Sequence, residues 1–140
     1  MFFGEFEYKL DEKGRLPLPP RFRERLKGGI VLAPGLEKCI SVYPIEEWQK
    51  LSEKIASSRV SPSKLRKLSR AIFATAFYLG LDGQGRVSLP APLREYAGVG
   101  DEVIVAGVNA SLEIWGKEQW LKEKSESQEQ AWQIIEGLDR

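Results

Sequence analysis

The feature of this sequence that most constrains its fold is an internal repeat. The chain contains one turn-like segment twice, DEKGR at 11–15 and DGQGR at 82–86. Leu-Pro and then Arg-Glu follow both copies at the same offsets, at 18–19 and 23–24 and again at 89–90 and 94–95. Such a repeat predicts two copies of one structural unit. Two turns that each end on arginine indicate a symmetric ligand, such as duplex DNA.

Each copy predicts the same order of elements: a strand, the turn, a short strand, a short helix and a strand hairpin. In the first copy we expect a strand at 2–10, a helix at 21–26 and a hairpin of the apolar runs 30–32 and 39–43. In the second copy the order recurs, with strands at 76–81 and 87–89, a helix at 90–97 and a hairpin of 103–105 and 112–115. Trp48 has a counterpart in Trp120. The repeat therefore extends well beyond the turns.

Further helices are expected outside the repeated strands. Pro44 precedes apolar residues three or four apart, which predicts a helix. Ser61 and Pro62 fit the N-cap and first turn of a connecting helix. Its Lys and Arg residues form either a solvated side or a surface that contacts phosphates or another subunit. A last helix, from about Lys117, is expected to pack weakly or on a neighbouring chain. We divide the chain into a first half (1–56), a connecting basic helix (57–74), a second half (75–120) and a C-terminal helix (121–140).

Charge is distributed unevenly, although the net charge is only +1. Residues 1–70 hold 15 Lys and Arg against 9 Asp and Glu, whereas residues 71–140 hold 6 against 11. Such asymmetry is typical of proteins with a nucleic-acid or other polyanion partner. It fits equally well a solvated basic helix in one half and an acidic helix in the other.

The composition disfavours enzymes of several classes. The chain has no histidine, which removes Ser-His-Asp triads and imidazole-bound zinc. It has no phosphate-binding loop motif and no apolar run of about 18 residues that would span a bilayer. Cys39, the single cysteine, is expected to be a buried strand residue. The acid pairs Asp11/Glu12 and Asp101/Glu102 are weak support for catalysis, because adjacent acids usually point to different faces. We expect no catalytic residue, metal or cofactor, and a soluble, unexported protein.

A series of longer motifs extends along the chain in a fixed order. They are M-F-x-G-E at the start, D-x-K-G-R with L-P-x-x-F-R at 11–23, Y-P-x-x-x-W at 43–48, D-x-x-G-R with L-P-x-x-L-R-E-Y-A at 82–97 and E-I-W-x-x-x-x-W at 113–120. In this order they closely resemble the motifs of the MraZ family, bacterial regulators encoded at the head of the division and cell-wall gene cluster.

The resemblance implies an α+β fold in which two tandem AbrB/MazE-like (SpoVT) halves form a swapped-hairpin β-barrel with short flanking helices. It implies a transcriptional regulator, usually a repressor, that binds double-stranded DNA at repeated boxes upstream of that gene cluster, including its own promoter. It further implies a homo-oligomer, expected to be a ring, in the cytoplasm and associated with the nucleoid. Catalysis, a cofactor, a small-molecule substrate and a membrane partner are not expected.

Arg15 and Arg86 are the first candidates for DNA contact, because the guanidinium fork suits a phosphate or the edge of guanine. Lys13 adds a point charge that its neutral counterpart Gln84 lacks, so we expect the first turn to contribute more affinity. Additional candidates are Arg23 and Arg94, which either contact DNA or brace the short helices through ion pairs with Glu24 and Glu95. The residues that shape the turns are Asp11, Gly14, Asp82 and Gly85.

One alternative function remains open from the residues themselves. An antitoxin-like protein-binding module would act mainly through a protein partner held by the C-terminal helix. The acidic second half and Trp132 are the features that favour it.

Overall fold

The computed structural model describes residues 1–138 and has the α+β class expected from the sequence. Most predicted elements are present, although the strand expected at 76–81 is shorter and the one expected at 103–105 extends to Asn109. Residues 139–140 of the expected C-terminal helix lie outside the described range. The elements are β1 (Phe2–Lys9), β2 (Arg15–Pro17), α1 (Pro20–Leu26), β3 (Ile30–Pro34), η1 (Leu36–Lys38), β4 (Ile40–Pro44), α2 (Ile45–Ala56), α3 (Pro62–Ile72), β5 (Phe77–Leu79), β6 (Arg86–Ser88), α4 (Ala91–Ala97), β7 (Glu102–Asn109), β8 (Leu112–Gly116) and α5 (Lys117–Leu138).

The main sheet is antiparallel and interleaves the two copies of the repeat. Its six strands lie in the order β1-β7-β8-β4-β3-β5. The first strand of each copy pairs with the hairpin of the other copy, β1 with β7 and β5 with β3. The two hairpins meet where β4 pairs with β8. Exchanging the copies reverses this order onto itself, so the sheet has a pseudo-two-fold relationship between the halves.

The expected closure of the sheet into a barrel is wrong. Pairing in the large sheet ends at β1 and β5, and β2 and β6 form a separate two-stranded ladder. Each of these two strands has only three residues. Pro17 is the last residue of β2 and Pro19 follows shortly after it, and proline has no N–H with which to extend a ladder. The short ladder therefore lies against the sheet without joining its edges.

One hydrophobic core is shared by both copies. Leu16 and Val87 face each other in the β2–β6 ladder, and neither is exposed. Burying an aliphatic side chain of this size stabilises the fold by about 1.5–3 kcal/mol. Cys39 is buried as predicted, but it lies just before β4, and its Sγ donates to the carbonyl of Leu36 at 3.3 Å. Burial raises the pKa of this thiol. The core thus joins the two halves into one unit.

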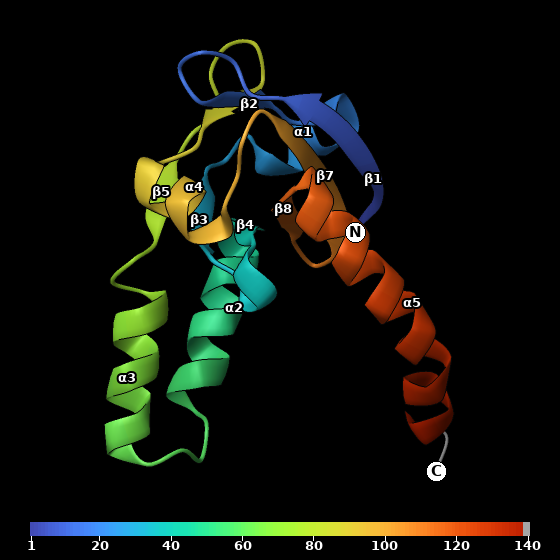
Figure 1. Ribbon diagram of the computed structural model, residues 1–140. Coiled ribbons are helices and arrows are strands. Elements are labelled where there is room, and N and C mark those ends of the chain that lie inside the picture. Colours follow the sequence, from blue (N-terminus) through green and yellow to red (C-terminus); the bar gives the residue numbers. More distant parts are fainter. Residues whose placement is uncertain (139–140) are drawn as a thin grey trace.

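Three helices project from this core as arms, away from the two turns (Figure 1). The Trp48 ring of α2 meets the Phe73 ring, just after α3, with centroids 5.3 Å apart, which holds α2 and α3 together. The start of α5 is anchored to β1, where Trp120 Nε1 donates to Glu5 at 3.1 Å. Beyond Lys124 nearly all of α5 is exposed. The turns and the arms therefore occupy opposite ends of the molecule.

Candidate nucleic-acid interface

The first turn is built around the Asp11 carboxylate. Asp11 Oδ1 accepts hydrogen bonds from the backbone N–H groups of Lys13 and Arg15, both at 2.9 Å. The Gly14 N–H donates to the Asp11 carbonyl at 3.0 Å, and Gly14 has φ of +74°, which glycine adopts without strain. Asp11 and Gly14 therefore shape the turn, as their residue types predict.

The second turn reproduces this geometry. Asp82 Oδ1 accepts from the backbone N–H groups of Gln84 and Arg86, both at 2.9 Å. Gly85 also has φ of +74°. The two copies of the repeat thus form the same turn, and the exposed side chains of Lys13 and Gln84 lie at equivalent positions of the two loops.

Each turn arginine is held by the aspartate of its own turn. Arg15 Nε donates to Asp11 Oδ2 at 2.6 Å, and Arg86 Nε donates to Asp82 Oδ2 at 2.8 Å. Because this bond uses Nε, the terminal amino groups keep N–H donors for a further acceptor. The arginine side chains are 31% and 26% exposed. Both guanidinium groups are therefore preorganised and remain accessible to a ligand.

The turn aspartates stay ionised. The pKa of Asp11 lies below its ordinary value, chiefly because the backbone N–H of Arg15 donates to its carboxylate, and the Arg15 side chain lowers it further. The pKa of Asp82 is lowered chiefly by the backbone N–H of Arg86. Each aspartate therefore offsets the charge of its arginine, and the turns carry less net positive charge than their arginines alone would give.

The two turns lie side by side, because the short ladder joins their bases. Leu18 N donates to the Gly85 carbonyl at 3.1 Å, and Leu89 N donates to the Gly14 carbonyl at 3.0 Å. Arg86 Nη1 also lies 3.8 Å from Asp11 Oδ2, a contact between the copies that the sequence alone did not predict. Arg15 and Arg86 therefore belong to one composite surface.

Arg23 and Arg94 each hydrogen-bond within their own copy and pack against the turn glycine of the other copy. Arg23 Nε donates to the Leu18 carbonyl at 3.0 Å, and its guanidinium fills the space that a Cβ on Gly85 would need. Arg94 Nε donates to the Leu89 carbonyl at 3.1 Å, and a Cβ on Gly14 would lie 3.2 Å from its Cζ. These bonds assign both arginines a positioning role in the free protein.

The ion pairs expected for Arg23 and Arg94 with their neighbouring glutamates are not formed in the described residues. Glu24 instead pairs with Lys27 at 2.8 Å. Bracing therefore uses backbone carbonyls, and the expected carboxylate partners were wrong.

Two other arginines of the first copy are already engaged within the chain. Arg21 lies 5.0 Å and 4.9 Å from the ring centroids of Phe3 and Phe6, and it donates to the Phe3 carbonyl at 3.1 Å. Arg25 pairs with Glu47 at 3.4 Å. Arg21 and Arg25 thus make contacts that hold α1 in place.

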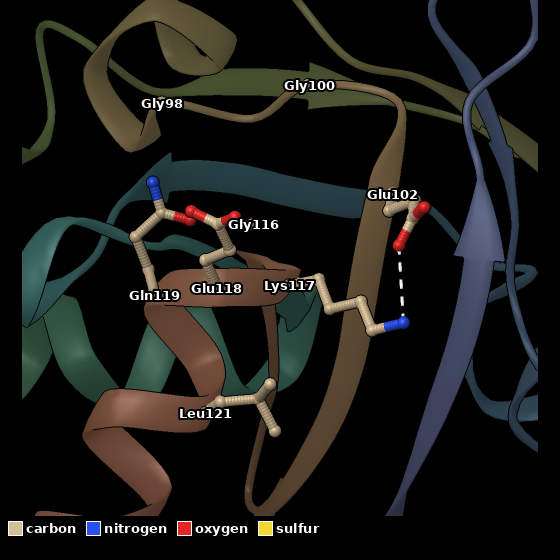
Figure 2. A pocket seen from close by; sticks show the side chains of 8 residues that line it. All are labelled: Gly98, Gly100, Glu102, Gly116, Lys117, Glu118, Gln119 and Leu121. Carbon is tan, nitrogen blue, oxygen red and sulfur yellow. Dashed lines mark ion pairs between the residues drawn. The ribbon is translucent and has the colours of Figure 1, made fainter.

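A separate concave region lies where α5 begins (Figure 2). Lys117 Nζ lies 3.2 Å from carboxylate oxygens of both Glu7 and Glu102. These carboxylates, Glu7 foremost, raise the pKa of Lys117. The arrangement fixes the start of α5 on β1 and β7. The residues around this concavity are Gly98, Gly100, Glu102, Gly116, Lys117, Glu118, Gln119 and Leu121.

Comparison with known proteins gives consistent similarities over most of the chain. A family model described as "MraZ protein, putative antitoxin-like" matches residues 1–70 and 72–135. A Dehalococcoides mccartyi protein named "Transcriptional regulator MraZ" is 66% identical over 140 residues, 99% of each chain. Proteins of the same name from Thermomicrobium roseum and Frankia alni are 45% and 42% identical, covering 86% and 94% of this chain and 84% and 91% of theirs. Across residues 1–138, no helix has the length and apolar character needed to cross a membrane.

Proposed function

This chain belongs to the MraZ family and is a transcriptional regulator, and we propose that it binds promoter DNA through the two arginine turns. The observation that carries the proposal is the adjacency of Arg15 and Arg86. Both lie on matching turns at one end of the molecule, joined by the β2–β6 ladder and related by the pseudo-two-fold symmetry. A surface of this symmetry matches the symmetry of duplex DNA.

In the proposed complex the turn arginines donate from their terminal amino groups to phosphate oxygens or to a guanine edge. Lys13 adds an ionic contact to a phosphate, whereas Gln84 offers only a neutral hydrogen bond. Arg23 and Arg94 act mainly by holding the turns in place. The first turn therefore contributes more of the salt-dependent affinity than the second.

In the cell, we propose that the protein represses the division and cell-wall gene cluster from repeated boxes upstream, its own promoter included. The two AbrB/MazE-like halves, 1–56 and 75–120, supply one turn each, and the segment 57–74 connects them. Several copies assemble into a ring that meets successive boxes, associated with the nucleoid in the cytoplasm. The proposed role requires no cofactor and no catalytic step.

A footprint on the DNA upstream of the protein's own gene tests this proposal. Protection of short boxes at regular spacing, lost as salt concentration rises, is the expected result. Absence of protection at every concentration up to the solubility limit would overturn it.

A second candidate, a protein-binding module, is favoured by the exposed end of α5, where the side chains of Trp132 and Leu138 are unpartnered within the described residues. Recovery of a stoichiometric protein partner by the purified chain, together with failure to bind upstream DNA, would favour this candidate over the first.

A further inference from the structure

A concave region lies beside the second turn, where α1 ends. Its walls are the turn segment 81–85 and three residues of the first copy, Arg23, Glu24 and Lys27. Arg23 packs against Gly85, and Lys27 is the C-terminal cap of α1. This second-turn concavity places two cations of the first copy beside the turn of the second copy, at the end of the molecule where both turns lie (Figure 1).

Lys27 is available to an anionic ligand. Within residues 1–138 its ammonium has one ion-pair partner, Glu24, at 2.8 Å, and the two side chains are 70% and 82% exposed. Ion pairs this exposed contribute little to stability, because water screens them and both long side chains lose freedom. A phosphate of duplex DNA carries a full charge, and a lysine that neutralises it releases counterions condensed on the duplex. Exchange of Glu24 for a phosphate is therefore favourable for Lys27.

The surface beside the first turn has the opposite charge. The concave region there is lined by segments 9–12 and 101–102, which contain four carboxylates and one lysine. Two of these carboxylates, Glu12 and Asp101, are exposed and form no ion pair in the part of the chain that the structure describes. The repeat aligns Lys27 with Gly98, which ends α4 and has no side chain. The first turn therefore lacks a cation at the position that Lys27 occupies beside the second.

We infer that Lys27 binds a phosphate of the DNA backbone in the second-turn concavity, so that bound DNA extends from the turns over the end of α1. Gln84 lines the same concavity, so its amide N–H and the Lys27 ammonium donate to one phosphate. Lys27 thus supplies the cation that the tip of the second turn lacks, whereas the first turn has Lys13 at its tip. The inference rests on the proposed function, because the turn arginines bring the duplex to this surface.

The duplex extends to one side only. On the other side its phosphates would approach Glu12 and Asp101, and like charges brought together across an interface oppose binding. The two turns are related by the pseudo-two-fold symmetry, but the charges beside them are not. The protein therefore contacts more of the DNA backbone beyond the second turn than beyond the first.

The salt dependence of DNA binding tests the role of Lys27. Anisotropy titrations with labelled DNA from upstream of the protein's own gene compare Lys27→Ala with the unaltered protein at several salt concentrations. Lys27→Ala should weaken binding about five-fold near 0.1 M salt and reduce the slope of log affinity against log salt by about 0.9, the value for one phosphate contact. Lys27→Arg keeps the charge and should keep the slope.

The matched control is Lys50→Ala. Lys50 lies on α2, is 71% exposed and pairs at 3.2 Å with Glu47, three residues earlier, so it resembles Lys27 in exposure and pairing but belongs to an arm. Its replacement should leave affinity and slope unchanged. Circular dichroism verifies that each variant is folded, and Lys27→Gln replaces Lys27→Ala if the latter is not.

Asp101→Lys tests on which side of the turns the duplex extends. A cation at this position should meet no phosphate and should leave the slope unchanged, whereas a slope increased by about 0.9 would show that the backbone also passes the first turn. That increase, an unaffected Lys27→Ala beside a weakened Arg15→Ala, or equal losses in Lys27→Ala and Lys50→Ala would overturn the inference alone. Absence of DNA binding by the unaltered protein would overturn the proposed function together with it.

Discussion

Arg86 Nη1 lies 3.8 Å from Asp11 Oδ2, although the two residues belong to different copies of the repeat and are far apart in sequence. The same Oδ2 accepts the Nε–H of Arg15 at 2.6 Å. The Asp11 carboxylate thus binds Arg15 directly and lies within ion-pair distance of Arg86, whose closest carboxylate contact is with Asp82 at 2.8 Å. The two turns therefore form one surface. The contacts that stabilise this part of the fold involve the same arginines that are proposed to bind DNA.

The turn glycines are expected to be sensitive to substitution. Gly85→Ala places a Cβ at φ of +74° and against the Arg23 guanidinium, so it should destabilise the fold by about 1–3 kcal/mol. Gly83→Ala is the matched control, because nothing lies within 4 Å of its added Cβ. Urea unfolding followed by tryptophan fluorescence measures both. Equal stability of the two variants would contradict the bracing role of Arg23.

The shared core predicts that damage in the short ladder unfolds both halves together. Leu16→Ala removes a fully buried side chain at the centre of the β2–β6 ladder and should cost about 2–5 kcal/mol. Leu36→Ala, at a side chain that is 80% exposed, should change stability by less than about 0.5 kcal/mol. Calorimetry should record one transition for each variant. Two separate transitions would show that the halves fold independently.

The lowered pKa values of Asp11 and Asp82 predict acid sensitivity. A carboxyl whose folded pKa lies below its unfolded value stabilises the fold above the unfolded pKa, near 3.9, and this contribution is lost as pH falls through the folded pKa. The variant Asp11→Asn/Asp82→Asn keeps an oxygen acceptor in each turn but has no charge to titrate. Its melting temperature should therefore fall less between pH 5 and pH 3 than that of the unaltered protein. Differential scanning fluorimetry at about six pH values measures both melting temperatures. An identical fall would contradict the prediction.

The first turn has Lys13 where the second has Gln84, so substitutions at these two positions should change the salt dependence of DNA binding in opposite directions. Gln84→Lys adds a cation where the second turn has none and should make the salt dependence of DNA binding steeper, with a slope increased by about 0.9 per added phosphate contact. Lys13→Gln should reduce it by a similar amount. Anisotropy titrations at several salt concentrations measure both slopes. Unchanged slopes would place the loop tips away from the phosphates.

Local features of the fold follow well from the sequence. The repeat, the two turns and the hairpins were predictable because glycine, proline and aspartate act over a few residues. Ser61 accepts the Lys64 N–H at 3.3 Å and caps α3 as expected. The predicted bounds were less accurate for β5 and β7, where strand length depends on the partner strand rather than on the segment itself.

Non-local features could not be predicted. The pairing of β1 with β7 and the separation of the β2–β6 ladder from the main sheet depend on contacts between distant residues. The same holds for the site: DNA contact and an ion pair with the adjacent glutamate were the two roles expected for Arg23, but Arg23 donates to the carbonyl of Leu18, whose N–H is bonded to Gly85 in the turn of the other copy. Only the three-dimensional arrangement shows that the repeated arginines 23 and 94 serve opposite turns.

Binding of promoter DNA by the turn arginines is tested most directly by fluorescence anisotropy with labelled DNA from upstream of the protein's own gene. Arg15→Ala is compared with Arg59→Ala, an exposed arginine outside both turns and outside the helices. Loss of a charge-assisted contact costs about 1.5–3 kcal/mol, so Arg15→Ala should weaken binding by roughly ten-fold or more while Arg59→Ala leaves it nearly unchanged. A folded Arg15→Ala variant that binds as tightly as the unaltered protein would contradict DNA binding through the turn arginines.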